Sequence, residues 1–198
     1  MTFTTLRLTA ASAIPLFDGH VRRLGEDARG ALQHFASLAA EGIYRVWWDG
    51  RQLTTQLRGP SRLKDGVAVR RVVSPVAAAQ GRFPKPAAPC VYDAVRGGAE
   101  VSLLTDARGD VLFEADSAAL VAWDGASLVL SPDEAPAVAS VSEAEVALRL
   151  PHRRALIPAS GAWPLLLINA VVGSCAPAGC GVFPVEWRRR IDEVLHAN

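Results

Sequence analysis

The chain has 198 residues, with 21 basic side chains against 20 acidic ones, and neither sign gathers into a run. This length is sufficient to bury a hydrophobic core without disulfide or metal cross-links. Because the charges nearly cancel, nothing favours nucleic acid or an anionic membrane as a partner, so small molecules and protein partners remain.

Three cysteines, Cys90, Cys175 and Cys180, have neither the spacing of a zinc knuckle nor that of a redox pair. The first residues show no signal or transit peptide. We therefore expect reduced thiols and a cytoplasmic protein. The long uncharged stretch between Arg154 and Glu186 is divided by several prolines and glycines, which favours buried strands and turns over a membrane span.

The first part of the chain predicts a small α+β lobe. Residues 2–10 alternate like a strand, and a helix is expected from about His20 to Ala40. Two β-rich segments, 43–48 and 52–57, flank Asp49-Gly50, which predicts a hairpin with a tight type I′ turn. Residues 67–74 predict another strand.

The segment from Pro75 to Pro89 is rich in proline and alanine and predicts the linker between two lobes. A short helix is expected over 91–96. A meander of strands is expected next, over residues 100–106, 110–115, 117–123 and 127–132. Helices follow from Ser140 to Leu148 and, with an amphipathic pattern, from Val185 to His196. The predicted fold class is α+β, with a small lobe over 1–80 and a larger β-rich lobe over 86–198.

General catalytic motifs such as GxSxG, a glycine-rich phosphate loop and HExxH are missing from the sequence, and no metal is expected. His20 and Arg23 lie one helical turn apart, where they either hold an anion or form a solvated helix face. Lys85 stands between two prolines in an extended segment; it is solvated unless burial favours its neutral, nucleophilic form. Glu114 ends an apolar strand and needs a partner if buried.

The order of these residues resembles the class IV aminotransferase family of fold-type IV pyridoxal-phosphate (PLP) enzymes. That family includes aminodeoxychorismate lyases, branched-chain aminotransferases and D-amino-acid aminotransferases. Residues 3–24 resemble the family opening that brings a histidine and, three residues later, an arginine beside the cofactor phosphate. Tyr44-Arg45-Val46 resembles an arginine-bearing strand, and Tyr92-Asp93 follows Lys85 at the distance found in short lyases.

The resemblance implies a role for each of these residues. Lys85 would attach PLP covalently and shuttle the substrate proton, and Glu114 would pair with the pyridine nitrogen. Arg23 and Ser140 would bind the phosphate. Substrate-binding roles would fall to His20, Arg45 and Tyr92.

The sequence also departs from the family pattern. Ala119 stands where the family has asparagine, residues 136–140 lack the glycine, threonine and arginine of the phosphate-binding turn, and residues 169–173 lack another arginine. The leading expectation is a homodimeric PLP enzyme. It would either release pyruvate from aminodeoxychorismate to give p-aminobenzoate or act as a small aminotransferase on an amine or amino acid. The alternative is a degenerate, non-catalytic homologue that binds another ligand or a protein partner.

Overall fold

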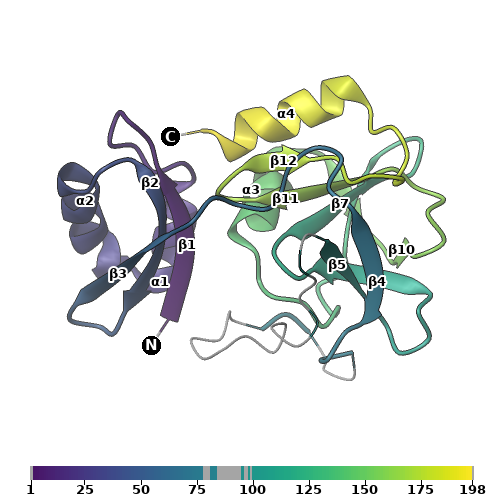
Figure 1. Cartoon of the computed structure of the whole chain (residues 1–198), viewed down its shortest axis with the longest axis horizontal. Coiled ribbons are helices and arrows are strands. Elements are labelled where there is room, and N and C mark those ends of the chain that lie inside the picture. Colours follow the sequence, from purple (N-terminus) through teal and green to yellow (C-terminus); the bar gives the residue numbers. More distant parts are fainter. Residues whose placement is uncertain (1, 78–80, 84–94, 96–97, 99, 198) are drawn as a thin grey trace.

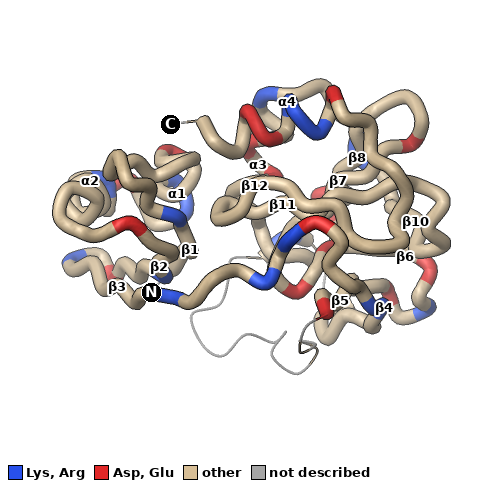
Figure 2. The backbone as a smooth tube through the Cα atoms, turned by 45° about the horizontal axis from the view of Figure 1, so that its top comes forward, with Lys and Arg blue, Asp and Glu red and all other residues tan. Residues whose placement is uncertain are grey.

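A computed structural model describes residues 2–77, 81–83, 95, 98 and 100–197 (Figure 1). The predicted α+β class is confirmed. The strands form three sheets, in the orders β1-β2-β3, β10-β6-β5-β4 and β12-β11-β7-β8-β9. Figure 2 shows basic and acidic positions interspersed along the backbone, as the balanced composition led us to expect.

The first sheet is antiparallel and carries its helices on one face. Its elements are β1 (Thr2–Leu8), α1 (Phe17–Leu24), η1 (Glu26–Ala28), α2 (Arg29–Leu38), β2 (Gly42–Trp48) and β3 (Leu53–Arg58). Alternate strand residues such as Leu6, Val46 and Trp48 pack against Val21 and Leu32 of the helices. Because strand side chains alternate, the residues between them occupy the opposite, open face of this sheet.

Two predictions in this region need correction. The single helix expected over 20–40 is interrupted at Gly25, whose φ of +116° is unsuited to an L side chain, so α1 ends and η1 and α2 follow. The hairpin is confirmed, but its turn is not a two-residue type I′ turn. Trp48 pairs with Leu53, which leaves a four-residue loop. The Asp49 carboxylate accepts from the amides of Arg51 and Gln52, both at 2.8 Å, and this favours the wider turn.

The second sheet joins strands from both sides of the predicted linker. β4 (Val69–Val73) pairs in parallel with β5 (Val101–Thr105), which pairs antiparallel with β6 (Val111–Ala115), and β10 (Ile157–Pro158) completes the sheet. Leu63 and Val67 belong to the same core. The division into two lobes stays a proposal; these contacts favour placing residues from about 63 onward with the second lobe. The helix expected over 91–96 lies outside the described residues, apart from position 95.

The third sheet lies between the second sheet and two helices (Figure 1). Its strands are β7 (Ala119–Trp123), β8 (Leu128–Leu130), β9 (His152–Arg154), β11 (Leu165–Asn169) and β12 (Gly173–Cys175), and the helices are α3 (Val141–Arg149) and α4 (Val185–Leu195). Leu167 faces the second sheet, whereas Leu166 and Ile168 face the helices. Burial on both faces explains why LLLI in β11 is continuously apolar.

Several further predictions hold. The expected strands at 100–106, 110–115, 117–123 and 127–132 and both C-terminal helices are confirmed. Cys175 and Cys180 are free thiols, as expected; Cys90 lies outside the described residues. In the described part of the chain, no helix is both long and apolar enough to cross a membrane.

Candidate active site

A cavity of about 720 Å³ lies against the open face of the first sheet. One wall consists of side chains from β1 to β3 and the segment that follows β3. The other wall comes from the β6–β7 turn, the start of α3 and the end of β11. The cavity thus joins parts of the chain that are more than 100 residues apart in sequence.

Five of the seven predicted site residues line this cavity, namely His20, Arg23, Arg45, Glu114 and Ser140. The other two, Lys85 and Tyr92, lie outside the described residues. The structure therefore brings His20 and Arg23 of α1 to the same cavity as Arg45 of β2 and Glu114 of β6. These residues are far apart in the sequence.

Helix α1 presents His20 and Arg23 to the cavity. The His20 side chain is buried, and its Nδ1 lies 2.7 Å from the hydroxyl of Thr4 on β1. Partial burial lowers the pKa of the Arg23 guanidinium from its usual value to about 10. Among the described residues, no acceptor or carboxylate contacts this guanidinium. A half-buried guanidinium of this kind is chemically suited to bind an anion.

Close packing fixes α1 against α3. A Cβ added at Gly19 would lie 2.7 Å from Cγ1 of Val141, so only glycine permits this approach. Arg22 of α1 also pairs with the buried Glu145 of α3. These contacts place Arg23 beside the start of α3.

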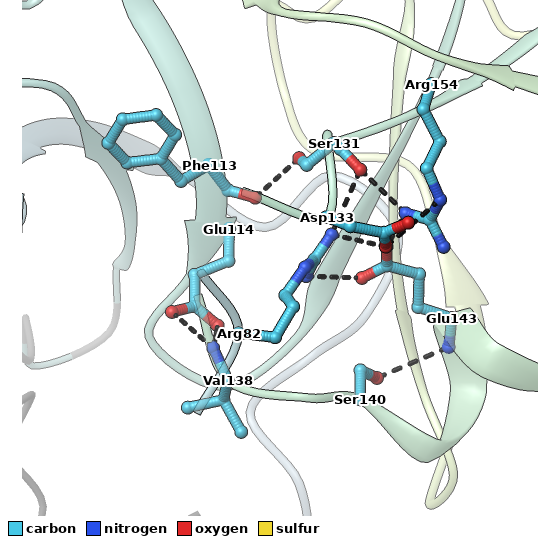
Figure 3. A network of polar contacts seen from close by, with 9 residues as sticks. All are labelled: Arg82, Phe113, Glu114, Ser131, Asp133, Val138, Ser140, Glu143 and Arg154. Atoms are coloured by element: carbon cyan, nitrogen blue, oxygen red, sulfur yellow. Dashed lines mark hydrogen bonds and ion pairs between the residues drawn. The ribbon is translucent and has the colours of Figure 1, made fainter. Parts of the chain in front are cut away.

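Glu114 is a buried carboxylate on β6, with 5% of its surface exposed. The backbone N–H of Val138 donates to both of its oxygens at 3.1 Å (Figure 3). The carboxylate therefore has polar support inside the protein and still lines the cavity.

The segment before α3 contains Ser140, one of the predicted phosphate-binding residues. Ser140 caps the helix, and its hydroxyl accepts from the N–H of Glu143 at 3.3 Å. The amide of Val138 donates to the Glu114 carboxylate, and the amide of Ala139 donates to the carbonyl of Phe83. The first turn of α3, with Val141 and Ser142, faces the cavity. The backbone N–H groups at the start of a helix have no carbonyl acceptor within it, and they favour a bound anion.

An ion network behind the cavity was not predicted from the sequence. The buried Glu143 accepts from Arg82 at 2.6 and 2.9 Å and from Arg154 at 2.9 Å (Figure 3). Both arginines also donate to the carbonyl of Ser131. The network joins α3 to β9, to the end of β8 and to residues 81–83, and so fixes the start of α3.

Three further polar residues of the cavity also escaped prediction, because no local pattern distinguishes them. Asp116 is buried directly after β6 and pairs with Arg62, which follows β3. Arg58 ends β3 and also lines the cavity. Their closeness depends on long-range packing between the first sheet and the β6–β7 turn.

No protein-family model matches the sequence, and no curated protein matches it. Solved structures do match over almost the whole chain. A 4-amino-4-deoxychorismate lyase from Pseudomonas aeruginosa has 16% identity and a TM-score of 0.64, covering 98% of this chain and 89% of its own. A hypothetical aminotransferase from Mycobacterium tuberculosis, in its α-ketoglutarate- and PMP-bound form, has 14% identity and a TM-score of 0.65, with coverages of 98% and 87%. A putative branched-chain amino acid aminotransferase from Thermotoga maritima has 15% identity and a TM-score of 0.66, with coverages of 97% and 83%.

These matches establish the fold, which is that of the fold-type IV PLP enzymes. Within that class, the similar structures include both aminodeoxychorismate lyases and aminotransferases, at low sequence identity throughout.

Proposed function

We propose that this chain binds PLP in the described cavity and acts as an aminodeoxychorismate-lyase-like enzyme or a small aminotransferase. The observation that carries the proposal is that Arg23 and Glu114 line one cavity. One is a half-buried cation without a contacting acceptor in the described part of the chain, and the other is a buried carboxylate. PLP carries the two groups that complement them, a phosphate and a basic ring nitrogen.

The residues present fit this cofactor. Arg23 and the first turn of α3, capped by Ser140, would hold the phosphate. Glu114 would accept a hydrogen bond from the protonated ring nitrogen. When bound, PLP supplies an electron sink for the pair left behind when a substrate bond to carbon breaks.

Only one lysine is a candidate for attaching the cofactor. The sequence contains only two lysines, Lys64 and Lys85. Lys64 is exposed and does not line the cavity. Lys85 is therefore our candidate for covalent attachment of the cofactor and for moving a proton at the substrate carbon. His20, Arg45 and Tyr92 would orient the substrate.

A non-catalytic homologue is the second candidate, and one observation favours it. The amides of Val138 and Ala139 are bonded within the chain and are not available to a phosphate. This leaves fewer donors at the phosphate end than a glycine-rich turn presents, so we expect weak PLP affinity.

Titration with PLP, followed by visible absorbance, separates the two candidates. Saturable binding, with release of pyruvate from aminodeoxychorismate or amino transfer to 2-oxoglutarate, supports the enzyme. A folded protein that shows no saturable binding of PLP supports the non-catalytic homologue.

We also propose a homodimer with the two cavities near the shared interface. Trp47 and Trp48 are consecutive on β2 and so face opposite sides. Trp48 is buried under the helices, whereas Trp47 is half-buried on the open face beside Phe3. A second chain would complete the cover over Trp47. Light scattering tests this proposal: a monomer mass at micromolar concentration contradicts it.

A further inference from the structure

Strand β3 forms an edge of the first sheet that has no strand beside it in the described part of the chain. The sheet order is β1-β2-β3, and among the described residues β3 pairs only with β2. Five of the six residues of β3 are exposed, whereas every residue of β1, at the opposite edge, is buried or half-buried. An open strand edge offers backbone N–H and C=O groups to another strand.

The outward backbone groups of β3 belong to alternate residues. The amide of Asp49 donates to the carbonyl of Gln52 at 3.5 Å, just before the strand. From this pair onward, the alternation of an antiparallel ladder directs the N–H and C=O groups of Leu53, Thr55 and Leu57 away from β2. These are the groups that a further strand would meet.

Strand β3 carries none of the features that commonly keep an edge strand from pairing. Proteins protect such edges with lysine, proline, bulges or inward-pointing charges. The strand LTTQLR contains neither lysine nor proline, its register with β2 is continuous, and its only charged residue, Arg58, is the last one. Leu57 also leaves 64% of its surface exposed. A regular edge with exposed apolar surface is suited to strand addition.

The sequence of β3 fits a second copy of itself. Residues 53–57 read Leu-Thr-Thr-Gln-Leu, which is nearly palindromic about Thr55. When two copies of this strand run antiparallel about a two-fold axis at Thr55, Leu57 of each copy lies opposite Leu53 of the other. In the same register Thr55 lies opposite Thr55, and Thr54 lies opposite Gln56. Apolar side chains therefore meet apolar ones, and polar side chains meet polar ones.

Neighbouring registers fit less well. A shift of two residues in one direction places Leu57 opposite Thr55, and a shift in the other direction places it opposite Arg51. In the register centred on Thr55, Arg58 lies opposite Gln52, so like charges do not oppose each other.

We infer that β3 binds β3 of a second copy of this chain, so that the two first sheets join into one antiparallel sheet. Leu57 would then pack against Leu53, which already lies against the core of the first lobe. On the open face, Gln56 of the second copy would lie beside Thr54, the neighbour of Trp47 in the register. The inference rests on the homodimer proposed above and names its contact strand; it does not depend on PLP.

Disulfide trapping in the full-length protein tests the register. Thr55→Cys places two thiols directly opposite each other, where Cα atoms lie about 5.5 Å apart, within the range of a disulfide. Thr54→Cys is the matched control, because its two copies are diagonal neighbours about 7–8 Å apart, which is too far. Under mild oxidation with diamide, we expect a linked dimer, reversed by dithiothreitol, in Thr55→Cys but not in Thr54→Cys or in the wild-type protein with its native thiols.

Analytical ultracentrifugation of lysine variants tests the strength of the contact. Leu57→Lys places a charge opposite Leu53 of the second copy, and Leu148→Lys alters a leucine on α3 that is exposed to a similar degree, 71% against 64%. We expect Leu57→Lys to raise the dimer dissociation constant about tenfold or more, and Leu148→Lys to leave it within about twofold. Circular dichroism verifies that both variants are folded.

The outcomes separate the proposals. A stable dimer without the Thr55→Cys cross-link, or with equal cross-linking of Thr54→Cys, would overturn pairing through β3 and leave the homodimer to another surface. Equal weakening by the two lysine variants would overturn it as well. A wild-type chain that stays monomeric would overturn both the inference and the homodimer. A cross-linked dimer that binds no PLP would refute the proposed enzyme function alone.

Discussion

The backbone N–H of Val138 donates to both carboxylate oxygens of Glu114 at 3.1 Å, so β6 and the segment before α3 meet at this buried acid. The bond holds the carboxylate in place independently of any ligand. Because the donor is a backbone N–H group, a substitution at Glu114 leaves this donor in place.

The first prediction concerns this carboxylate. Glu114→Gln keeps an acceptor for the Val138 amide but removes the negative charge that would keep the ring nitrogen protonated. Turnover should fall by at least a hundredfold, on the order of 3 kcal/mol, while PLP occupancy falls much less. Asp110→Asn, at an exposed acid just before the same strand, is the control. Equal losses of turnover and occupancy would contradict the assigned role.

The second prediction concerns the phosphate end. Arg23→Gln removes one charge-assisted hydrogen-bonding group, worth on the order of 1.5–3 kcal/mol, so the Kd for PLP should rise roughly ten- to a hundredfold. Fluorescence titration measures this. Arg51→Gln, in the exposed β2–β3 loop, should leave the Kd unchanged. An unchanged Kd in Arg23→Gln would remove Arg23 from the phosphate site.

The third prediction concerns stability without ligand. Burial lowers the pKa of Arg23 to about 10, so the folded state disfavours its charge. For a cation with a depressed pKa, this penalty is fully present below the folded pKa and is relieved only as the pH rises from the folded pKa towards the higher pKa of the unfolded chain. Arg23→Gln should therefore leave the ligand-free chain equally or more stable in urea unfolding, with no pH dependence from this residue near neutrality. A large loss of stability would indicate a structural role instead.

The fourth prediction concerns the network around Glu143. Glu143→Gln leaves Arg82 and Arg154 close together without their shared counter-charge. Breaking a buried ion pair in this way typically costs about 3–5 kcal/mol of unfolding free energy. Glu193→Gln removes an exposed partner of Arg189 and should cost less than about 1 kcal/mol. Urea denaturation of both variants gives the comparison, and similar values for the two would contradict the structural role of the network.

Local signals in the sequence predicted most of the elements. Ser140 followed by Glu143 indicated the start of α3, the alternating pattern of residues 2–10 indicated β1, and turn residues between apolar segments indicated β5 to β8. Gly25 was the missed signal in the first helix, because a glycine at a helix end was read as part of a continuous apolar period. The β2–β3 turn was misjudged because the Asp49 side chain bonds to amides two and three residues ahead and stabilises a longer loop.

Contacts between segments that are far apart in the chain were harder to predict from the sequence. Placing β4 beside β5 depends on pairing across the linker segment, for which the sequence carries no local signal. Among the residues that line the cavity, residue chemistry had singled out His20, Arg23 and Glu114, and the resemblance added Arg45 and Ser140; their roles stay predictions. Arg58 and Asp116 belong to no motif, and only the packing of the first sheet against the β6–β7 turn brings them to the cavity.

The most direct test is reduction with borohydride after PLP is added, followed by peptide mass mapping. Because Lys64 and Lys85 are the only lysines, the possible attachment sites are few. We predict that the cofactor is fixed to the peptide containing Lys85, that Lys85→Ala abolishes this attachment and the visible absorbance, and that Lys64→Ala changes neither. Cofactor recovered unattached, or fixed to Lys64, would contradict the central claim that this chain is a PLP enzyme acting through Lys85.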